Sequence, residues 1–288
     1  MINKLLCIIA LGVILGFSTA GAQTAPAADA RVKGQIVAAR VQGHVTAISK
    51  ATQESRLLHD GDLVSEQTTI ATGSGASVIL AFSNGATVDV AADSKLDVAE
   101  FEQDPFSTSI KASDIKQEAG TSVTRLNLTR GELVGRVAHL NVDKGSEFTV
   151  RTPVGAAGIR GTVVGVIFIP LKGGKAHFEI ETFEGLVAFT PGGGGNPILI
   201  PAGHKFDETV EFKPTDVDNP WDWLPPPPPT VELLFLSPDE AAHFQAELRN
   251  ILGALENIDF PQSLGTPPPP PPPAPPMNAP TPGAGTGP

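Results

Sequence analysis

The sequence contains no tyrosine, two tryptophans and a single cysteine among its 288 residues. The cysteine, Cys7, falls in the N-terminal leader described below, so the rest of the chain can form neither a disulfide nor a cysteine-ligated metal site. The six histidines include no His-Glu-x-x-His pattern and no pair at metal-ligand spacing. We therefore expect a core held together by packing alone, with no metal and no cofactor.

Basic residues are also scarce. The chain has 20 lysines and arginines against 31 aspartates and glutamates, which gives a net charge of −11. Loss of the leader, which carries Lys4, leaves 19 basic residues and a net charge of −12. This balance disfavours nucleic acid and anionic membrane surfaces as partners.

The N-terminus has the pattern of a secretory signal peptide. Lys4 precedes an apolar run over residues 5–17, and Ala20-Gly21-Ala22 gives a small-residue cleavage pattern. The pattern predicts a signal peptide over residues 1–22, removed before Gln23, and a periplasmic or secreted protein. A membrane span needs roughly 20 apolar residues, so we expect no stable membrane span after cleavage. A retained signal anchor is the alternative.

Proline divides the rest of the chain. Of 28 prolines, 19 follow Leu224, with runs at residues 225–229 and 267–273. Such runs adopt extended polyproline II and cannot build a core. We therefore expect a flexible lead over residues 23–31, an acidic and proline-rich linker over residues 213–236, and a disordered tail over residues 260–288.

Residues 32–212 are predicted to be all-β, because short Val/Ile/Leu/Phe/Thr runs alternate with glycine turns every 8–12 residues. The clearest unit is a hairpin over residues 77–92, in which Asn84-Gly85 is typical of a two-residue type I′ turn. That turn would pair Ile79 with Val90 and Ala81 with Val88, making one apolar face.

One amphipathic helix is predicted over residues 237–259. Ser237, Pro238 and Glu240 supply an N-cap, a first-turn proline and the glutamate of a capping box. A single apolar stripe follows: Phe244, Leu248, Ile251, Leu252, Leu255 and Ile258. The stripe can be buried against the β-domain, or it can serve self-association or a partner's groove.

The most informative segment runs over residues 148–162. A β-rich run ends at Thr152-Pro153, crosses a loop with two glycines, and restarts after Arg160-Gly161-Thr162. It contains no nucleophile, base or metal-ligand set. The segment therefore indicates a requirement on backbone geometry and not a catalytic motif.

This segment resembles the hallmark of the FecR domain family, the periplasmic part of iron-dicitrate-type regulators and of related exported bacterial proteins. Further segments similar to the family's turns occur in the expected order: residues 60–63, 70–76, 82–85, 130–133, 184–187 and 201–203. The resemblance covers about residues 34–206. It implies an all-β domain of solenoid-like or sandwich character, and the sequence does not choose between these two.

The resemblance implies an exported, non-enzymatic module that senses or regulates by binding a ligand or a protein, with an unknown envelope protein or glycan as partner. The family's regulators carry a cytoplasmic sigma-factor-binding segment and a transmembrane helix before this domain. Here about 30 residues, predicted to contain a signal peptide, precede it, so we do not expect the transmembrane anti-sigma role. The alternatives are an envelope or cell-wall scaffold, and a polysaccharide-active enzyme. The enzyme would rest only on scattered carboxylates such as Glu179 and Glu181, whose shared strand face is typical of a solvated one.

The residues that carry the resemblance are expected to be mainly structural. They are Gly61, Asp62, Thr72, Gly73, Asn84, Gly85, Gly131, Thr152, Pro153, Arg160, Gly161, Thr162, Gly185 and Gly203. Arg160 can anchor its loop by donating to backbone carbonyls, or it can contact an anionic ligand or partner. Trp221 and Trp223 can pack the linker onto the core, or stack on a sugar or a partner. These three residues are the candidates for partner binding, and we expect no catalytic residue.

Overall fold

The computed structural model describes residues 31–106, 108–211 and 232–261. The predicted signal peptide, most of the linker and almost all of the tail lie outside these residues. The fold is all-β with one helix, α1 (Pro238–Leu255), and two short 3-10 turns, η1 (Ala112–Asp114) and η2 (Val142–Lys144). This confirms the predicted fold class. No helix in the described ranges has both the length and the apolar character needed to cross a bilayer.

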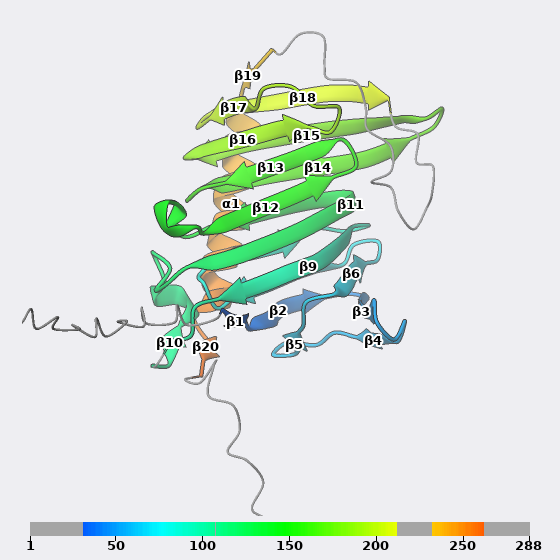
Figure 1. Ribbon diagram of the computed structural model, residues 1–288. Coiled ribbons are helices and arrows are strands. Elements are labelled where there is room, and N and C mark those ends of the chain that lie inside the picture. Colours follow the sequence, from blue (N-terminus) through cyan, green and yellow to red (C-terminus); the bar gives the residue numbers. More distant parts are fainter. Residues whose placement is uncertain (1–30, 107, 212–231, 262–288) are drawn as a thin grey trace, which may run out of the picture. The chain divides into compact units, whose positions relative to one another are not determined.

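The strands form two large sheets, A and B, which share one strand (Figure 1). Sheet A contains, in spatial order, β4 (Ser55–Leu57), β3 (Val45–Ser49), β6 (Thr68–Thr72), β9 (Lys95–Gln103), β11 (Ser122–Arg136), β12 (Glu147–Thr152), β13 (Gly155–Ile159), β16 (Leu186–Pro191) and β17 (Ile198–Pro201). The short β1 (Val32–Lys33) pairs with the end of β9. Every pairing in this sheet is antiparallel except that of β11 with β12.

Sheet B contains, in spatial order, β5 (Leu63–Val64), β2 (Ile36–Gln42), β7 (Ser77–Phe82), β8 (Thr87–Val90), β11, β14 (Val163–Leu171), β15 (Lys175–Glu184), β18 (His204–Glu211) and β19 (Leu234–Phe235). All of its pairings are antiparallel. A separate two-stranded sheet joins β10 (Ile110–Lys111) to β20 (Asp259–Phe260).

Strand β11 belongs to both sheets. Its first part, up to Arg130, pairs with β9 and β12 in sheet A, and its last part, Gly131 to Arg136, pairs with β8 and β14 in sheet B. The strand changes sheet at Gly131, whose φ of 96° lies in the left-handed region that favours glycine. A Cβ at this position would lie 2.1 Å from Oγ of Ser94. Only glycine therefore lets one strand join the two sheets here.

The inner faces of the two sheets pack directly on each other. The ring of Phe82 on β7 meets that of Phe101 on β9 edge-on, with centroids 5.1 Å apart. Further along, Phe178 on β15 contacts Phe189 on β16 at 4.9 Å. All four side chains are at most 2% exposed. These contacts between sheets identify the β-domain as a face-to-face sandwich.

The predicted hairpin exists, but its predicted register was wrong by one residue. Val90 faces Val78, and Val88 faces Leu80, because the loop holds three residues instead of two. Phe82 N donates to Ala86 O at 2.9 Å, and of the two turn residues only Gly85 has a positive φ, 90°. This combination is typical of a type I turn closed by a glycine bulge. The one-residue change moves Ile79 and Ala81 from the inner to the outer face of sheet B.

Helix α1 covers that outer face. Its buried side chains Phe244, Ile251 and Leu255 pack in one cluster with apolar residues of β2, β7, β11 and β14, namely Ala39, Ile79, Ala81, Val134 and Val163. The helix crosses the strands of sheet B behind sheet A in Figure 1. The apolar stripe of α1 is therefore buried against the β-domain, which was the first of the two predicted possibilities.

The ends of helix α1 follow from local hydrogen bonds. Ser237 Oγ accepts from Glu240 N at 3.2 Å, and Ser237 N donates to Glu240 Oε2 at 2.6 Å, which is the predicted capping box. The helix ends at Leu255, four residues earlier than predicted, where the Leu255 carbonyl accepts from Ile258 N. The chain then turns into β20, so Phe260, predicted to lie in the tail, is buried.

Substitution of Gly131 by alanine tests the shared strand. Gly173, at the β14–β15 turn, is a matched control because its φ is also positive, 81°, but a Cβ there would meet nothing within 4 Å. We expect Gly173→Ala to lower the free energy of unfolding by about 1–2 kcal/mol, the cost of a left-handed alanine. Gly131→Ala should cost a further ~1–3 kcal/mol, because its methyl group overlaps Ser94. Equal losses in urea unfolding would contradict this account of the bend.

Candidate functional site

The segment at residues 152–162 forms a turn and a corner. Thr152 and Gly155 face each other at the tight turn between β12 and β13, where Thr152 Oγ1 donates to Gly155 O at 3.3 Å. The chain then leaves sheet A after Ile159 and enters sheet B at Val163. Arg160-Gly161-Thr162 is thus the connection between sheets, and Pro153 is buried in the preceding turn.

This corner packs against a second one, between β15 and β16. Gly161 has a φ of 62°, and a Cβ there would lie 2.9 Å from His139 Nδ1. A Cβ on Gly185 in the second corner would lie 2.8 Å from the Gly161 carbonyl oxygen and 2.6 Å from Thr162 Cγ2. The Thr162 carbonyl accepts from Val137 N at 2.9 Å. Close contact between the two corners accounts for the small residues of this segment.

The remaining residues of the family resemblance lie at separate turns and do not converge on one site. Asp62 accepts from His59 N at 3.0 Å, Thr72 Oγ1 donates to Ala91 O at 2.6 Å, and Gly73 N donates to His44 O at 2.9 Å. Asn84 donates to hydroxyls of Ser122 and Thr124 on β11. Gly61 and Gly203 have positive φ at open turns. Each role observed is structural.

Arg160 differs from its neighbours. Its side chain is exposed, and among the residues that the structure describes it makes no hydrogen bond to a carbonyl and no ion pair. The anchoring role expected for the guanidinium therefore has no contact to support it, while contact with a partner stays a hypothesis. Trp221 and Trp223 lie outside the described residues.

A polar seam that the sequence did not reveal runs between helix α1 and sheet B. We use this name for four helix residues, Glu240, His243, Glu247 and Asn250, and for the sheet residues that face them, Lys205, Glu179, Glu181, Glu132, Asp89 and Arg40. The helix residues recur every three or four positions, which places them on one stripe. That spacing was a signal for the helix half of the seam. The sheet half could not be read, because Glu179 and Glu181 were expected on a solvated face that α1 in fact covers.

Lys205 is the centre of one end of the seam. Its Nζ lies 2.6 Å from Glu179 Oε1, 2.8 Å from Glu240 Oε1 and 3.2 Å from Asp207 Oδ2. The ammonium, although desolvated, is bonded to three carboxylates, which raises the pKa of Lys205. The Lys205 bond lowers the pKa of Glu240 to about 2, against the effect of burial. This ion cluster ties the first turn of α1 to β15 and β18.

Two groups in this region have the spacing of metal ligands: His177, Glu179 and Asp207, and Glu179, Glu181 and Glu240. The Lys205 ammonium bonds to a member of each group. Its single charge and three hydrogen bonds do what a bound cation would do for these carboxylates. We therefore assign the cluster to helix docking and not to a metal.

Further along the seam, no lysine or arginine of the described residues forms an ion pair with Asp89, Glu132 or Glu181. Burial raises the pKa of Asp89 to about 7, and a hydrogen bond with Glu247 and the charge of Glu247 add to this effect. Burial likewise raises the pKa of Glu181 to about 7, with the charge of Glu179 adding to the effect. The pKa of Glu132 is also raised by burial, although His243 opposes this. Ionisation of these groups weakens the contact between α1 and sheet B.

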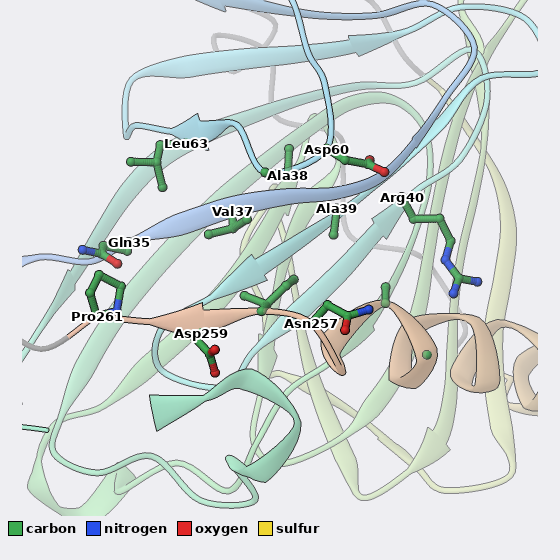
Figure 2. A pocket seen from close by; sticks show the side chains of 14 residues that line it. Gln35, Val37, Ala38, Ala39, Arg40, Asp60, Leu63, Asn257, Asp259 and Pro261 are labelled. Atoms are coloured by element: carbon green, nitrogen blue, oxygen red, sulfur yellow. The ribbon is translucent and has the colours of Figure 1, made fainter. Parts of the chain in front are cut away.

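A cleft opens at the other end of the helix (Figure 2). It holds about 580 Å³ and lies between β2, the turn at residues 60–63 and the segment that follows α1. Val37 and Ala39 of β2 lie in the middle of the view, with Arg40 at one end and Gln35 at the other. Cavities of this size suit small ligands or short peptide segments. Of the residues that line it, Asp60, Gly61 and Leu63 belong to one segment of the family resemblance, the turn at residues 60–63.

Comparison with protein families finds a match over part of the chain. The FecR protein family matches residues 68–188. No curated protein sequence matches the chain. Two crystal structures that resemble it are of a putative anti-sigma factor from Parabacteroides distasonis ATCC 8503, at 2.50 Å and 1.65 Å resolution.

The likeness to those two structures is low. The first has 13% identity and a TM-score of 0.38, and the match covers 62% of this chain and 63% of the other. The second has 10% identity and a TM-score of 0.36, and the match covers 68% and 86%. At these TM-scores we transfer neither fold nor function from them.

Substitutions in the corner distinguish Arg160, whose side chain is exposed, from Gly161, which the backbone geometry requires. We expect Arg160→Ala to leave the melting temperature unchanged, because its side chain loses no described contact. Gly161→Val should lower the free energy of unfolding by on the order of 1–3 kcal/mol, because valine at positive φ is strained and would meet His139. Thermal melts followed by circular dichroism measure both. A large drop for Arg160→Ala would restore the anchoring role.

The seam makes stability depend on pH. The pKa of Asp89 and that of Glu181 rise from about 4 in the unfolded chain to about 7 in the folded one, so the folded state binds these protons more tightly. The contribution of each carboxyl to the free energy of unfolding is therefore complete below pH 4 and is lost as the pH rises to 7. Glu240 has the opposite sign: its contribution is lost as pH falls from 4.5 to about 2. We therefore expect maximal stability near pH 4–5.

Neutral variants test this dependence. At pH 8, Asp89→Asn and Glu181→Gln should each raise the free energy of unfolding by on the order of 1–2 kcal/mol, and should flatten its fall between pH 5 and 8. Glu184→Gln, an exposed acid at the end of β15, is the control. Urea unfolding of each variant at pH 5 and at pH 8 measures this free energy. An unchanged slope in both variants would rule out these carboxyls as its source.

Proposed function

Because residues 68–188 of this chain are a FecR domain, we propose that the protein is an exported, non-catalytic module that senses or regulates by binding a ligand or another protein outside the cytoplasm. The family match is the observation that carries the proposal. The predicted signal peptide supports the location, since it would deliver the mature chain to the periplasm or the medium.

The state of the carboxylates supports a binding role over a polysaccharide-active enzyme. Glu179 is bonded to Lys205, and Glu181 is buried beside it under helix α1. A glycosidase needs two carboxylates that flank a substrate in an open cleft. These two are engaged in holding the helix instead.

Within the domain, we assign partner contact to the corner at Arg160. The glycines around it fix the backbone, and the guanidinium is exposed with no partner among the described residues. A positively charged group on an acidic protein is a specific feature for an anionic partner to recognise. The partner's chemistry would then include a carboxylate or another anion.

Cell fractionation and N-terminal sequencing test the location. We expect a soluble extracytoplasmic pool whose chain starts near Gln23. Co-sedimentation with the wall or the outer membrane would favour the scaffold alternative, and an intact Met1 in the cytoplasm would exclude export.

Binding is tested with the purified mature chain as bait for envelope proteins. Arg160→Ala should lose the partner at an unchanged melting temperature, whereas Lys172→Ala, an exposed cation at the β14–β15 turn, should keep it. Equal capture by wild type and Arg160→Ala would remove the corner from the proposal.

A further inference from the structure

Arg136 is a half-buried arginine with a nitrogen that lacks a partner. It is the last residue of β11, where it lies opposite Thr87 on β8 and Val163 on β14. Its Nη1 atom is buried and forms no hydrogen bond, and the guanidinium forms no ion pair with the residues that the structure describes. Buried polar groups of folded proteins nearly always have a partner, so this exception needs an explanation. An anion would satisfy both the N–H groups and the charge.

Arg136 lies beside the corner between β13 and β14. Val163, its partner across the sheet, is the first residue of β14 after this corner. His139 packs against the corner as well, since a Cβ on Gly161 would lie 2.9 Å from His139 Nδ1. The N–H of His139 donates to the Lys116 carbonyl at 3.1 Å, which adds a third chain segment. Residues from three distant parts of the sequence are therefore neighbours at this edge of the sandwich.

Several of these residues are cationic and have no ion pair. We use the name basic edge for Lys116, Arg136, His139 and Arg160. The side chains of Lys116, His139 and Arg160 are exposed. Within the described ranges, none of the four forms an ion pair. A group of unpaired cations stands out on a chain with a net charge of −11.

Three acids lie on the same chain segments or next to them, and in the described part of the chain none of them pairs with the basic edge. Glu118 is buried, and its carboxylate accepts from the Ser122 hydroxyl at 2.6 Å. Asp114 accepts from the hydroxyl of the preceding serine at 3.2 Å. Glu184, at the end of β15, is exposed, so solvent screens its charge. The donors of the basic edge are therefore available to an anion from another molecule.

We infer that the basic edge binds an acidic segment of a partner protein, with carboxylates on Lys116, Arg136 and Arg160. The inference deepens the binding role proposed for Arg160 and rests on it, since it names the chemistry of the partner. A guanidinium binds a carboxylate through two parallel hydrogen bonds.

The arrangement of the cations favours a segment over a small oxyanion. A small oxyanion offers its acceptors at one point, whereas these cations come from three separate chain segments. An extended segment places every second side chain on one face, about 7 Å apart, so acids at alternate positions can reach different cations. The net charge of the protein repels an acidic partner, but salt screens this repulsion beyond about 8 Å. Contacts at the edge itself therefore decide the affinity.

Fluorescence anisotropy of the purified mature chain tests the inference, with dye-labelled octaglutamate as the probe. We expect saturable binding at low ionic strength. Arg136→Gln should weaken it about 10-fold, because a half-buried charge is poorly screened. Arg160→Gln should weaken it about 3-fold, as expected for an exposed ion pair. Absence of saturable binding would overturn the inference.

Matched variants separate this contact from a response to net charge. Lys172→Gln removes an exposed cation at the β14–β15 turn and should leave binding unchanged. Arg136→Lys keeps the charge and should retain most of the affinity, while Glu184→Gln should strengthen binding. Melting curves accompany each variant, and we expect no change for Arg136→Gln, because no described hydrogen bond is lost. Equal losses in Lys172→Gln and Arg136→Gln would overturn the assignment to this edge.

Sodium sulfate distinguishes an acidic segment from a small oxyanion. At equal ionic strength, sulfate and chloride should weaken the binding of octaglutamate to the same extent. Displacement by millimolar sulfate beyond the effect of chloride would identify a small-oxyanion site and overturn the inference. Capture of an envelope protein that depends on Arg160, without any binding of octaglutamate, would overturn the inference and leave the proposed function in place.

Discussion

The structure depends on one strand that serves two sheets. Strand β11 pairs with β9 and β12 before Gly131 and with β8 and β14 after it. The inner faces of both sheets must therefore meet, and the aromatic contacts between β7 and β9 and between β15 and β16 fill the space between them. The corner at residues 160–162 repeats the task on a smaller scale, since it also moves the chain from one sheet to the other. The segment that resembles the FecR hallmark thus serves to connect the two sheets.

Much of this could be read from the sequence, because it rests on local chemistry. Turn glycines, the capping box of Ser237 and the apolar stripe of α1 act over a few residues, and each was predicted. The hairpin register was not, because Asn84-Gly85 is compatible with loops of two or three residues. Asn84 bonds to Ser122 and Thr124, which are 38 and 40 residues away, and those bonds hold the longer loop. The sequence does not show such distant partners.

The same limit explains why the candidate sites were missed. Glu179 and Glu181 alternate with apolar residues, a pattern typical of a strand with one solvated face. That reading fails because a helix more than fifty residues later covers the face and brings Glu240 with it. Arg40 was missed for a related reason. Its neighbours in the sequence form no motif, and it lies at a cleft only because β2 has a bulge there and the end of α1 packs beside it. Charge and strand period are visible in sequence, but burial by a distant element is not.

The seam and the cleft are joined through a single side chain. Asn250 accepts from Arg40 at the cleft, and its Nδ2 lies 3.4 Å from Asp89 Oδ2 in the seam. Burial raises the pKa of Asp89 to about 7, so the protonation of this carboxyl alters the hydrogen bonding of the Asn250 amide. The acidity of the medium therefore acts on the contact that holds α1 on sheet B and, through the same amide, on Arg40 at the edge of the cleft.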